Sequence, residues 1–276
     1  MVCGEIMIIY AKEFYRFLKH IVENKRLLVT LVKNDFKEQY LGSYFGIVWA
    51  FVQPLTFMLV IWFVFTYGFR SAPHGDTPYS LWLMSGMIPW FFISDALSTG
   101  TNAIISNSFL VKKVAFRVSI LPLVKIGSNL ILHIALVIFL IIVFLLYGFK
   151  PNLYWLQIPY FMLCSVFLIL GISWITSAIR VFVKDISQII TVILQIGFWA
   201  TPIFWNIGMI PVKYQWIFKL NPAFYIVQGY RDTFVNHMWF WEMPSVTIYF
   251  LSMSIITFII GAIVFKRLRP HFGDVL

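Results

Sequence analysis

The sequence predicts an all-α polytopic membrane protein with six transmembrane helices, an N-terminal amphipathic interfacial helix and short re-entrant helices between spans five and six. The chain is 61% hydrophobic and only 12% charged, about half the charged share of a soluble domain. It contains several apolar runs long enough to cross a hydrocarbon core of about 30 Å. Because no linker rich in Gly, Ser or Pro interrupts them, we divide the chain only into a cytosolic segment, 1–44, and a six-span domain, 45–276.

The basic residues set the orientation of the six spans. The spans are expected at 45–69, 79–99, 123–147, 158–179, 186–204 and 246–265. With both termini in the cytosol, fifteen Lys and Arg residues fall on the inside and five on the outside. Loops rich in Lys and Arg stay in the cytosol, so this split predicts cytosolic termini. The same rule accounts for the net charge of +10 without a nucleic-acid partner.

The first 44 residues predict a helix that lies in the cytosolic interface. Apolar residues recur at helical spacing, with charged residues on the opposite face. The apolar positions are Phe14, Phe17, Leu18, Ile21, Leu28, Leu31 and Val32. Such a stripe can dip into the headgroup region. A soluble helix packed on a partner protein is a second interpretation.

The first span begins with a charged ramp and contains a proline. The stretch KNDFKEQYLGSYFGIVWAFVQPL runs from Lys33 to Leu55, and it is already apolar where it reaches Gln53 and Pro54. Proline removes a backbone donor and clashes with the preceding turn of a helix. We therefore expect the helix to break at this point.

The segment 199–235 is expected to form short helices that dip into the outer leaflet. Pro202, Pro211 and Pro222 divide it into apolar pieces that are too short to span a membrane. Asn221 before Pro222 is typical of a helix start, with Asn as the N-cap and Pro at the first helical position. Non-helical backbone at this depth must be covered by protein or line a wet cavity, so the segment points to a pore mouth.

The sequence offers no catalytic or metal-binding motif. It has no Gly-Lys pair, so the phosphate loop GxxxxGK[ST] is absent, as are HExxH, CxxC and GxSxG. Asp95 is the one acidic residue clearly inside a span, where nearby Ser and Thr hydroxyls could satisfy it. His133 is expected to form a local hydrogen bond with Asn129. Because proton coupling usually needs several intramembrane acids or histidines, energy for transport would come from another protein.

In their order and spacing, these features resemble the bacterial ABC exporter permeases that move polysaccharides and teichoic acids. Beyond the ramp, the resemblance rests on GMIPWFFISDAL (86–97), NSFLVKKVAFRVSILPL (107–123), VKDISQI (183–189), FWATPIFW (198–205), NPAFYIVQGYRD (221–232) and RLRPHFGDVL (267–276). It covers nearly the whole chain. The NPAFYIVQGYRD block and the tail are most similar to wall teichoic acid permeases of the TagG/TarG type.

The resemblance implies a permease subunit that exports a lipid-linked cell-wall glycopolymer, wall teichoic acid, across the bacterial cytoplasmic membrane. Export of O-antigen or capsular polysaccharide is the alternative. The expected assembly is a homodimer with two copies of a separate ATPase, which binds ATP and Mg, so this chain needs no cofactor of its own. A membrane-embedded transferase and a passive channel are competing classes; the first lacks a clustered acidic site, and the second would not need the N-terminal helix or a basic cytosolic loop.

The resemblance also implies roles for particular residues. The elbow and the entrance into the membrane would use Asp35, Lys37, Tyr40, Gly42, Ser43 and Trp49. Coupling to the ATPase would use Asn107, Phe109, Leu110, Val111, Lys112, Lys113, Phe116 and Arg117. The conduit and a lateral gate would use Gln53, Pro54, Phe57, Gln195, Trp199, Thr201 and Pro202. An outer gate would use Tyr225, Gln228, Tyr230 and Arg231.

Two questions about these residues stay open at the level of sequence. Aromatic side chains of the spans could stack on the C–H faces of sugars, or they could face lipid as belt residues. Outer Lys213, Lys219 and Arg231 could meet the phosphates of a polymer or only lipid headgroups.

Overall fold

The computed structural model of the protein describes residues 23–40, 44–70, 77–111 and 117–276, and these are nearly all helical, without a β-strand. Five helical segments in this part of the chain are long and apolar enough to cross a membrane. They contain α3 (Val48–Phe63, continued by a π-helical turn, Val64–Gly68), α4 (Tyr79–Thr101), α7 (Leu121–Leu146), α8 (Ile158–Arg180) and α12 (Pro244–Leu268). Each lies where the sequence predicts a span, so the polytopic all-α fold is confirmed.

The helix at the expected fifth span is shorter than predicted. Helix α9 (Ile186–Ala200) has 15 residues, or about 22 Å at 1.5 Å per residue, which is less than the hydrocarbon core. Thr201 has extended backbone angles, φ −82° and ψ 133°. A residue that precedes proline is pushed out of the helical region, so Pro202 ends the helix.

Helix α3 does not break at Pro54, in contrast to the sequence-based expectation. It runs without interruption from Val48 to Phe63 with Pro54 inside it. Proline deprives a helix of one backbone hydrogen bond, and transmembrane helices tolerate this because neighbouring groups can satisfy the freed carbonyl. The departure from α-helical geometry comes later, in the π-helical turn at Val64–Gly68.

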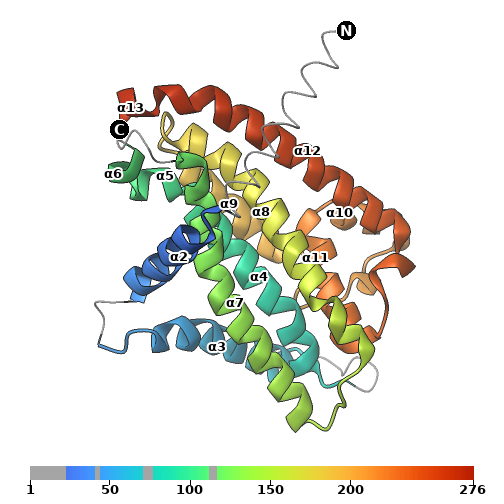
Figure 1. The fold of residues 1–276 in the computed structure, drawn as a ribbon. Coiled ribbons are helices and arrows are strands. Elements are labelled where there is room, and N and C mark those ends of the chain that lie inside the picture. Colours follow the sequence, from blue (N-terminus) through green and yellow to red (C-terminus); the bar gives the residue numbers. More distant parts are fainter. Residues whose placement is uncertain (1–22, 41–43, 71–76, 112–116) are drawn as a thin grey trace.

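Helix α4 forms the centre of the bundle, and it packs against α7, α8 and α11 (Pro222–Arg231) (Figure 1). Helices α8 and α12 form the other large contact. They approach closely at Gly171, where a Cβ atom would lie 2.9 Å from the backbone of Phe258. Small residues allow such close approach between membrane helices.

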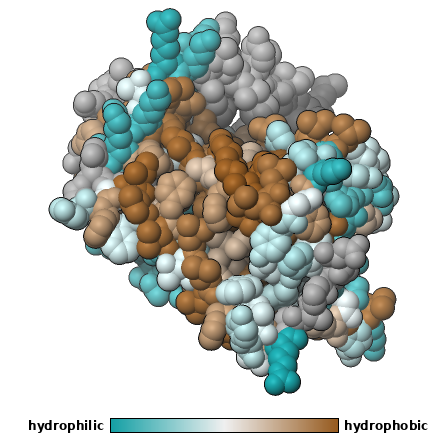
Figure 2. Space-filling view, turned by 90° about the horizontal axis from the view of Figure 1, so that it is seen from below, coloured by the Kyte–Doolittle hydropathy of each residue, from teal (hydrophilic) through white to brown (hydrophobic). Residues whose placement is uncertain are grey.

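Helix α3 is the least covered of the five. It lies across α7 and α4 near one end of the bundle (Figure 1). Only 11% of its apolar window is buried, against 72% for α4. Apolar side chains also gather across the middle of the molecular face seen in Figure 2, with hydrophilic ones at its rim. Apolar surface of this extent marks contact with lipid or with another protein.

Helix α2 (Lys25–Tyr40) is the described part of the N-terminal segment, and it packs against α7. The predicted apolar positions Leu28, Leu31 and Val32 are all partly buried. Val32 approaches Gly127 so closely that a Cβ atom there would lie 2.9 Å from the Val32 side chain. The stripe of α2 therefore faces a helix of its own chain, and the stripe positions before residue 23 lie outside the described residues.

Short elements connect the long helices. On one side of the bundle they are α5 (Ala103–Ser106), α6 (Ser108–Val111), a 3-10 turn (Val118–Ile120), a second 3-10 turn (Arg269–His271) and α13 (Phe272–Val275). On the other side they are 3-10 turns at Leu153–Gln157, Ile207–Met209 and Phe240–Glu242, helices α10 (Val212–Lys219) and α11, and a π turn (Asp232–Asn236). Two short helices between α9 and α12 were predicted, and α10 and α11 confirm them.

Candidate functional site

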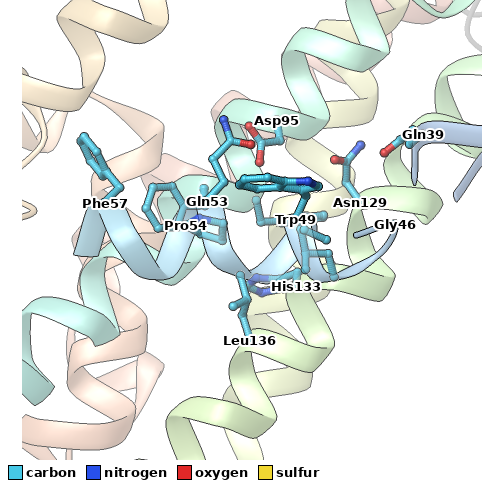
Figure 3. Close-up of a pocket in the computed structure, with 14 residues that line it drawn as sticks. Gln39, Gly46, Trp49, Gln53, Pro54, Phe57, Asp95, Asn129, His133 and Leu136 are labelled. Carbon is cyan, nitrogen blue, oxygen red and sulfur yellow. The ribbon is translucent and has the colours of Figure 1, made fainter. Parts of the chain in front are cut away.

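A cavity of about 550 Å³ lies between α3, α4 and α7, with the end of α2 at its edge (Figure 3). Its polar lining residues are Gln39, Gln53, Asp95, Asn129 and His133. Its apolar lining residues are Gly46, Trp49, Ala50, Pro54, Phe57, Phe91, Phe92, Leu132 and Leu136. A volume of this size is within the range of small-molecule sites. Three residues from the predicted conduit, Gln53, Pro54 and Phe57, meet here.

Asp95 and Gln53 present unused hydrogen-bonding groups to this cavity. Among the described residues, none forms a hydrogen bond or ion pair with the Asp95 carboxylate or the Gln53 carboxamide. The Thr99 hydroxyl, which could have satisfied the carboxylate, instead donates to the backbone oxygen of Asp95 at 2.8 Å. Ionisable groups inside a span are costly, and they usually mark a pathway or a binding site.

His133 is held by a distant residue and not by its helix neighbour. Its Nε2 lies 2.6 Å from the Tyr230 hydroxyl, and its ring stacks on Phe92 with a centroid distance of 4.6 Å. Asn129, the expected partner, donates to the Thr99 hydroxyl and to the backbone oxygen of Lys125, each at 2.8 Å. The predicted local bond between His133 and Asn129 is therefore wrong, because each side chain bonds to a different partner.

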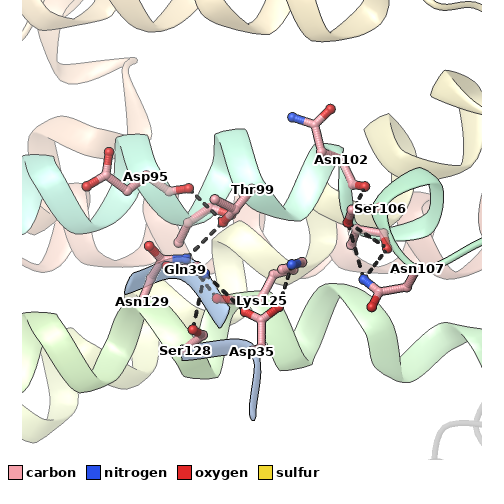
Figure 4. Close-up of polar contacts among 12 residues, drawn as sticks. Asp35, Gln39, Asp95, Thr99, Asn102, Ser106, Asn107, Lys125, Ser128 and Asn129 are labelled. Atoms are coloured by element: carbon pink, nitrogen blue, oxygen red, sulfur yellow. Dashed lines mark hydrogen bonds and ion pairs between the residues drawn. The ribbon is translucent and has the colours of Figure 1, made fainter. Parts of the chain in front are cut away.

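A polar network joins α2 to α7 and α7 to α4 (Figure 4). The Lys125 ammonium forms an ion pair with Asp35, whose side chain is only 8% exposed. The Gln39 carboxamide donates to Asp35 at 3.0 Å and to Ser128 at 3.2 Å. The bond from Asn129 to Thr99 then continues the network into α4. Polar groups that are satisfied in this way fix the relative position of the helices they join.

The residues predicted at the entrance into the membrane are spread over this region. Asp35 belongs to the network, Lys37 is exposed, and Trp49 lines the cavity with about half of its surface uncovered. The Tyr40 side chain, Gly42 and Ser43 lie outside the described residues.

Arg231 caps the irregular backbone that follows α9. Its guanidinium donates to the backbone oxygens of Pro202 and Ile203 and lies over the Trp82 ring, 3.6 Å from the centroid. The side chain is 2% exposed. The planar fork of arginine suits two adjacent acceptors. Since Pro202 leaves this backbone without helical bonds, Arg231 supplies the donors that a buried segment at membrane depth requires.

The start of α11 is also tied to the end of α9. The Asn221 side chain accepts from the Ala223 N–H at 3.0 Å, which confirms the predicted N-cap before Pro222. The same side chain donates to the Thr201 hydroxyl at 2.8 Å. Thr201 and Pro202, predicted at the lateral gate, are therefore buried in this joint.

The predicted outer-gate residues do not present an open surface within one chain. Tyr225, Tyr230 and Arg231 are buried, and the Gln228 carboxamide donates to Asp232 at 2.8 Å. Tyr225 shares a hydrogen bond of 2.8 Å with Tyr160. Because Arg231 is buried, it cannot contact an external phosphate in this conformation.

Two predicted gate residues on α9 remain uncovered. Gln195 and Trp199 are exposed on the face of α9 that no described helix covers. Phe198, the neighbour of Trp199, contacts Phe57 of α3 at a centroid distance of 5.7 Å. Helices α3 and α9, predicted to flank a lateral gate, thus approach each other through one aromatic pair.

The predicted coupling loop is partly described. Phe109 on α6 is 62% exposed, whereas Leu110 and Val111 are half-buried against the core. Asn107 donates to the Ala103 backbone oxygen at 2.9 Å. Arg117 is partly buried at the start of the next turn. Lys112, Lys113 and Phe116 lie outside the described residues.

Several residues that shape these sites were not singled out from the sequence. The Arg231 guanidinium packs against Trp82 and Gly86, and a Cβ atom at position 86 would lie 2.6 Å from it. The pairing of Lys125 with Asp35 and of Asn129 with Thr99 was not predicted either. Lys125 and Asn129 are one turn apart on α7, and this spacing of polar residues in an apolar run was the available signal.

Comparison with known proteins gives matches over most of the chain. A model of the family described as "ABC-2 type transporter" matches residues 26–235. Two proteins of Klebsiella pneumoniae, both named O-antigen export system permease protein RfbA, are 32% and 31% identical to the chain over 256 residues, which is 91% of this chain and 95% of each relative. A protein of the same name from Myxococcus xanthus is 24% identical over 262 residues, 94% of this chain and 98% of that protein.

Proposed function

Because the chain belongs to the ABC-2 type transporter family, we propose that it is the permease subunit of an ATP-driven exporter of a lipid-linked surface polysaccharide of the O-antigen type. The observation that carries the proposal is the match to O-antigen export permeases along nearly the whole length of both chains. It favours the alternative drawn from the sequence over wall teichoic acid, because the three relatives described above are all named O-antigen export system permease proteins.

The energy for export comes from a partner. Membership of this family implies a separate ATPase, in agreement with the absence of a phosphate loop from the sequence. We place its docking surface at the end of the bundle that carries α5, α6 and α13 (Figure 1). The exposed ring of Phe109 gives this end an apolar contact, as expected for an interface anchor. In the sequence, the basic residues Lys112, Lys113 and Arg117 follow that anchor, and we propose that they contribute to coupling.

A second copy of the chain would complete the conduit. The loosely covered α3 and the exposed face of α9 both carry apolar side chains together with the carboxamides of Gln53 and Gln195. Two such faces, one from each subunit, would enclose a path with aromatic and amide groups along it. The lipid carrier would enter sideways between α3 and α9, and α11 with Tyr225, Gln228 and Tyr230 would close the outer end.

Deletion of the gene in its host tests the proposal. We expect surface polysaccharide to disappear and polyprenyl-linked polysaccharide to accumulate on the cytosolic side, with both effects reversed by a plasmid copy. A strain with an inactive nucleotide site in the partner ATPase should behave in the same way. Accumulation of a phosphate-rich polyol polymer would instead support teichoic acid export, and an unchanged surface would contradict the proposal.

A further inference from the structure

The cavity between α3, α4 and α7 has more free acceptors than donors. The Asp95 carboxylate offers only acceptors when ionised, and the Oδ1 of Asn129 receives no hydrogen bond from a described residue. The Gln53 carboxamide offers one acceptor and two donors, all unused among the described residues. A ligand that matches this set must bring hydroxyl or amide hydrogens.

The charge of the cavity disfavours a phosphate-rich ligand. Among the described residues that line it there is no Lys or Arg, and Asp95 is the one acidic group. The nearest cation along α7, Lys125, is engaged by Asp35. A diphosphate is an acceptor-only anion that requires cations or many N–H donors. It would be repelled by Asp95 and would find few partners here.

Aromatic rings complete the lining. Asp95, Gln53 and Asn129 are grouped around the Trp49 indole ring (Figure 3). Trp49 is 49% exposed, so a large part of the ring is free to contact a ligand. Phe57 and Phe91 form an edge-to-face pair at 6.0 Å in the same lining. The negative face of an aromatic ring attracts the positively polarised C–H groups of a sugar, while carboxylate and amide groups bind its hydroxyls.

The position of the cavity fits a ligand that arrives from the cytosolic leaflet. Asp95 lies six residues before Thr101, the last residue of α4, which corresponds to about 9 Å along the helix axis. The α3 side of the cavity is the least covered by the rest of the chain, since only Ala50 and Met58 of this helix are buried. A molecule whose tail stays in the bilayer could therefore place its head group in the cavity beside α3.

We propose that this cavity binds an uncharged sugar of the lipid-linked polysaccharide, with Asp95 accepting hydrogen bonds from its hydroxyls, Gln53 and Asn129 orienting it, and Trp49 contacting its C–H face. The proposal rests on the proposed export function and adds the part of the substrate that is recognised. It separates recognition of the sugar from that of the diphosphate, which must be bound elsewhere.

Photocrosslinking in the intact complex tests this assignment. The chain and its partner ATPase are reconstituted in nanodiscs, and the probe is a polyprenyl diphosphate that carries one hexose with a diazirine on the sugar. We expect labelled peptides from the cavity lining, around residues 49–57, 91–95 and 129–136. Asp95→Leu should lower the yield about ten-fold or more, as expected for loss of a hydrogen bond to a charged group. Trp49→Leu, which leaves the carboxylate in place, should lower it as well.

The matched control is Asp185→Asn, at the exposed N-cap position of α9, where the Asp side chain forms no capping hydrogen bond and Asn is an equally favoured residue. It should label like the wild type. Unchanged labelling in both Asp95→Leu and Trp49→Leu would overturn the assignment, and so would equal competition by sugar-free polyprenyl diphosphate and the hexose-bearing form. Export of polysaccharide by the wild-type complex is measured in parallel in liposomes, because nanodiscs have no inner compartment. If the complex exports nothing, the proposed function fails; if it exports normally and the labelling misses the cavity, only the sugar site fails.

Discussion

Replacement of Arg231 by methionine should destabilise the joint between α9 and α11 without changing the surface of the protein. The guanidinium donates to the backbone oxygens of Pro202 and Ile203 and stacks on Trp82. Methionine is of similar length and can retain a sulfur contact with the indole ring. It has no donor, however, so both buried oxygens lose their partner.

The magnitude follows from these contacts. A buried acceptor that loses its donor costs about 1–3 kcal/mol, and two are affected. Loss of a desolvated cation–π contact adds up to about 2 kcal/mol. Removal of a buried charge offsets part of this, because desolvation of an ion costs several kcal/mol. A net loss of roughly 3 kcal/mol corresponds to a fall in the apparent Tm of about 6–12 °C for a protein of this size.

The assay is the apparent Tm of the purified complex in nanodiscs, at one fixed heating rate because unfolding of such proteins is irreversible. Arg231→Lys keeps the charge but not the planar guanidinium, and it should lower the Tm less than Arg231→Met does. Lys150→Met, at an exposed position, is the matched control and should leave the Tm unchanged. A Tm for Arg231→Met that equals that of the control would refute the capping role.

A double-mutant cycle sharpens this test. Gly86→Ala places a methyl group 2.6 Å from the Arg231 guanidinium, so it should destabilise the wild-type protein. The same change should cost less when residue 231 is methionine, because the crowded group is gone. Equal costs in the two backgrounds would show that the contact between positions 86 and 231 does not matter.

Three further predictions concern the cytosolic side and the orientation. Asp35→Ala should leave the Lys125 ammonium unpaired and cost about 1–3 kcal/mol, read as a lower Tm, and exchange of the two residues should recover part of it; a Tm unaffected by Asp35→Ala would argue against the ion pair. A cysteine at position 213 should react with an impermeant maleimide on intact cells, whereas one at position 274 should not, and labelling at 274 would reverse the predicted orientation. Phe109→Glu should weaken association with the ATPase and lower export, measured by co-purification and surface polysaccharide, and full association would move the coupling surface elsewhere.

The long helices could be predicted because their information is local. Each apolar run is long enough to span the membrane, and its ends coincide with polar residues, prolines or glycines, so the limits of α4 and α8 differ little from the expected ones. The Asn221–Pro222 start of α11 was predictable for the same reason, since an N-cap depends on neighbouring residues alone. The end of α9 at Ala200 follows from Pro202, because the residue before a proline is pushed out of the helical region. The expected limit of 204 did not take this effect into account.

Pairings between distant residues could not be predicted. The bond between His133 and Tyr230, 97 residues apart in the chain, replaced the local bond that the sequence favoured. Arg231 was expected near the outer surface, but it turns inward because the backbone after α9 needs donors. The cavity beside α3 depends on how three helices cross, and no periodicity in one helix encodes that crossing. The continuity of α3 through Pro54 likewise depends on its membrane surroundings.

Reconstituted translocation is the decisive test of ATP-driven polysaccharide export by this chain. The chain and its partner ATPase are placed together in liposomes, polyprenyl-linked polysaccharide is supplied from the side of the ATPase, and transferred polymer is measured by its protection from an added glycosidase. If the chain exports polysaccharide with its partner, protection should require ATP, both proteins and an intact nucleotide site in the partner. Transfer by the chain without the ATPase, or no transfer of polysaccharide when both proteins and ATP are present, would contradict this function.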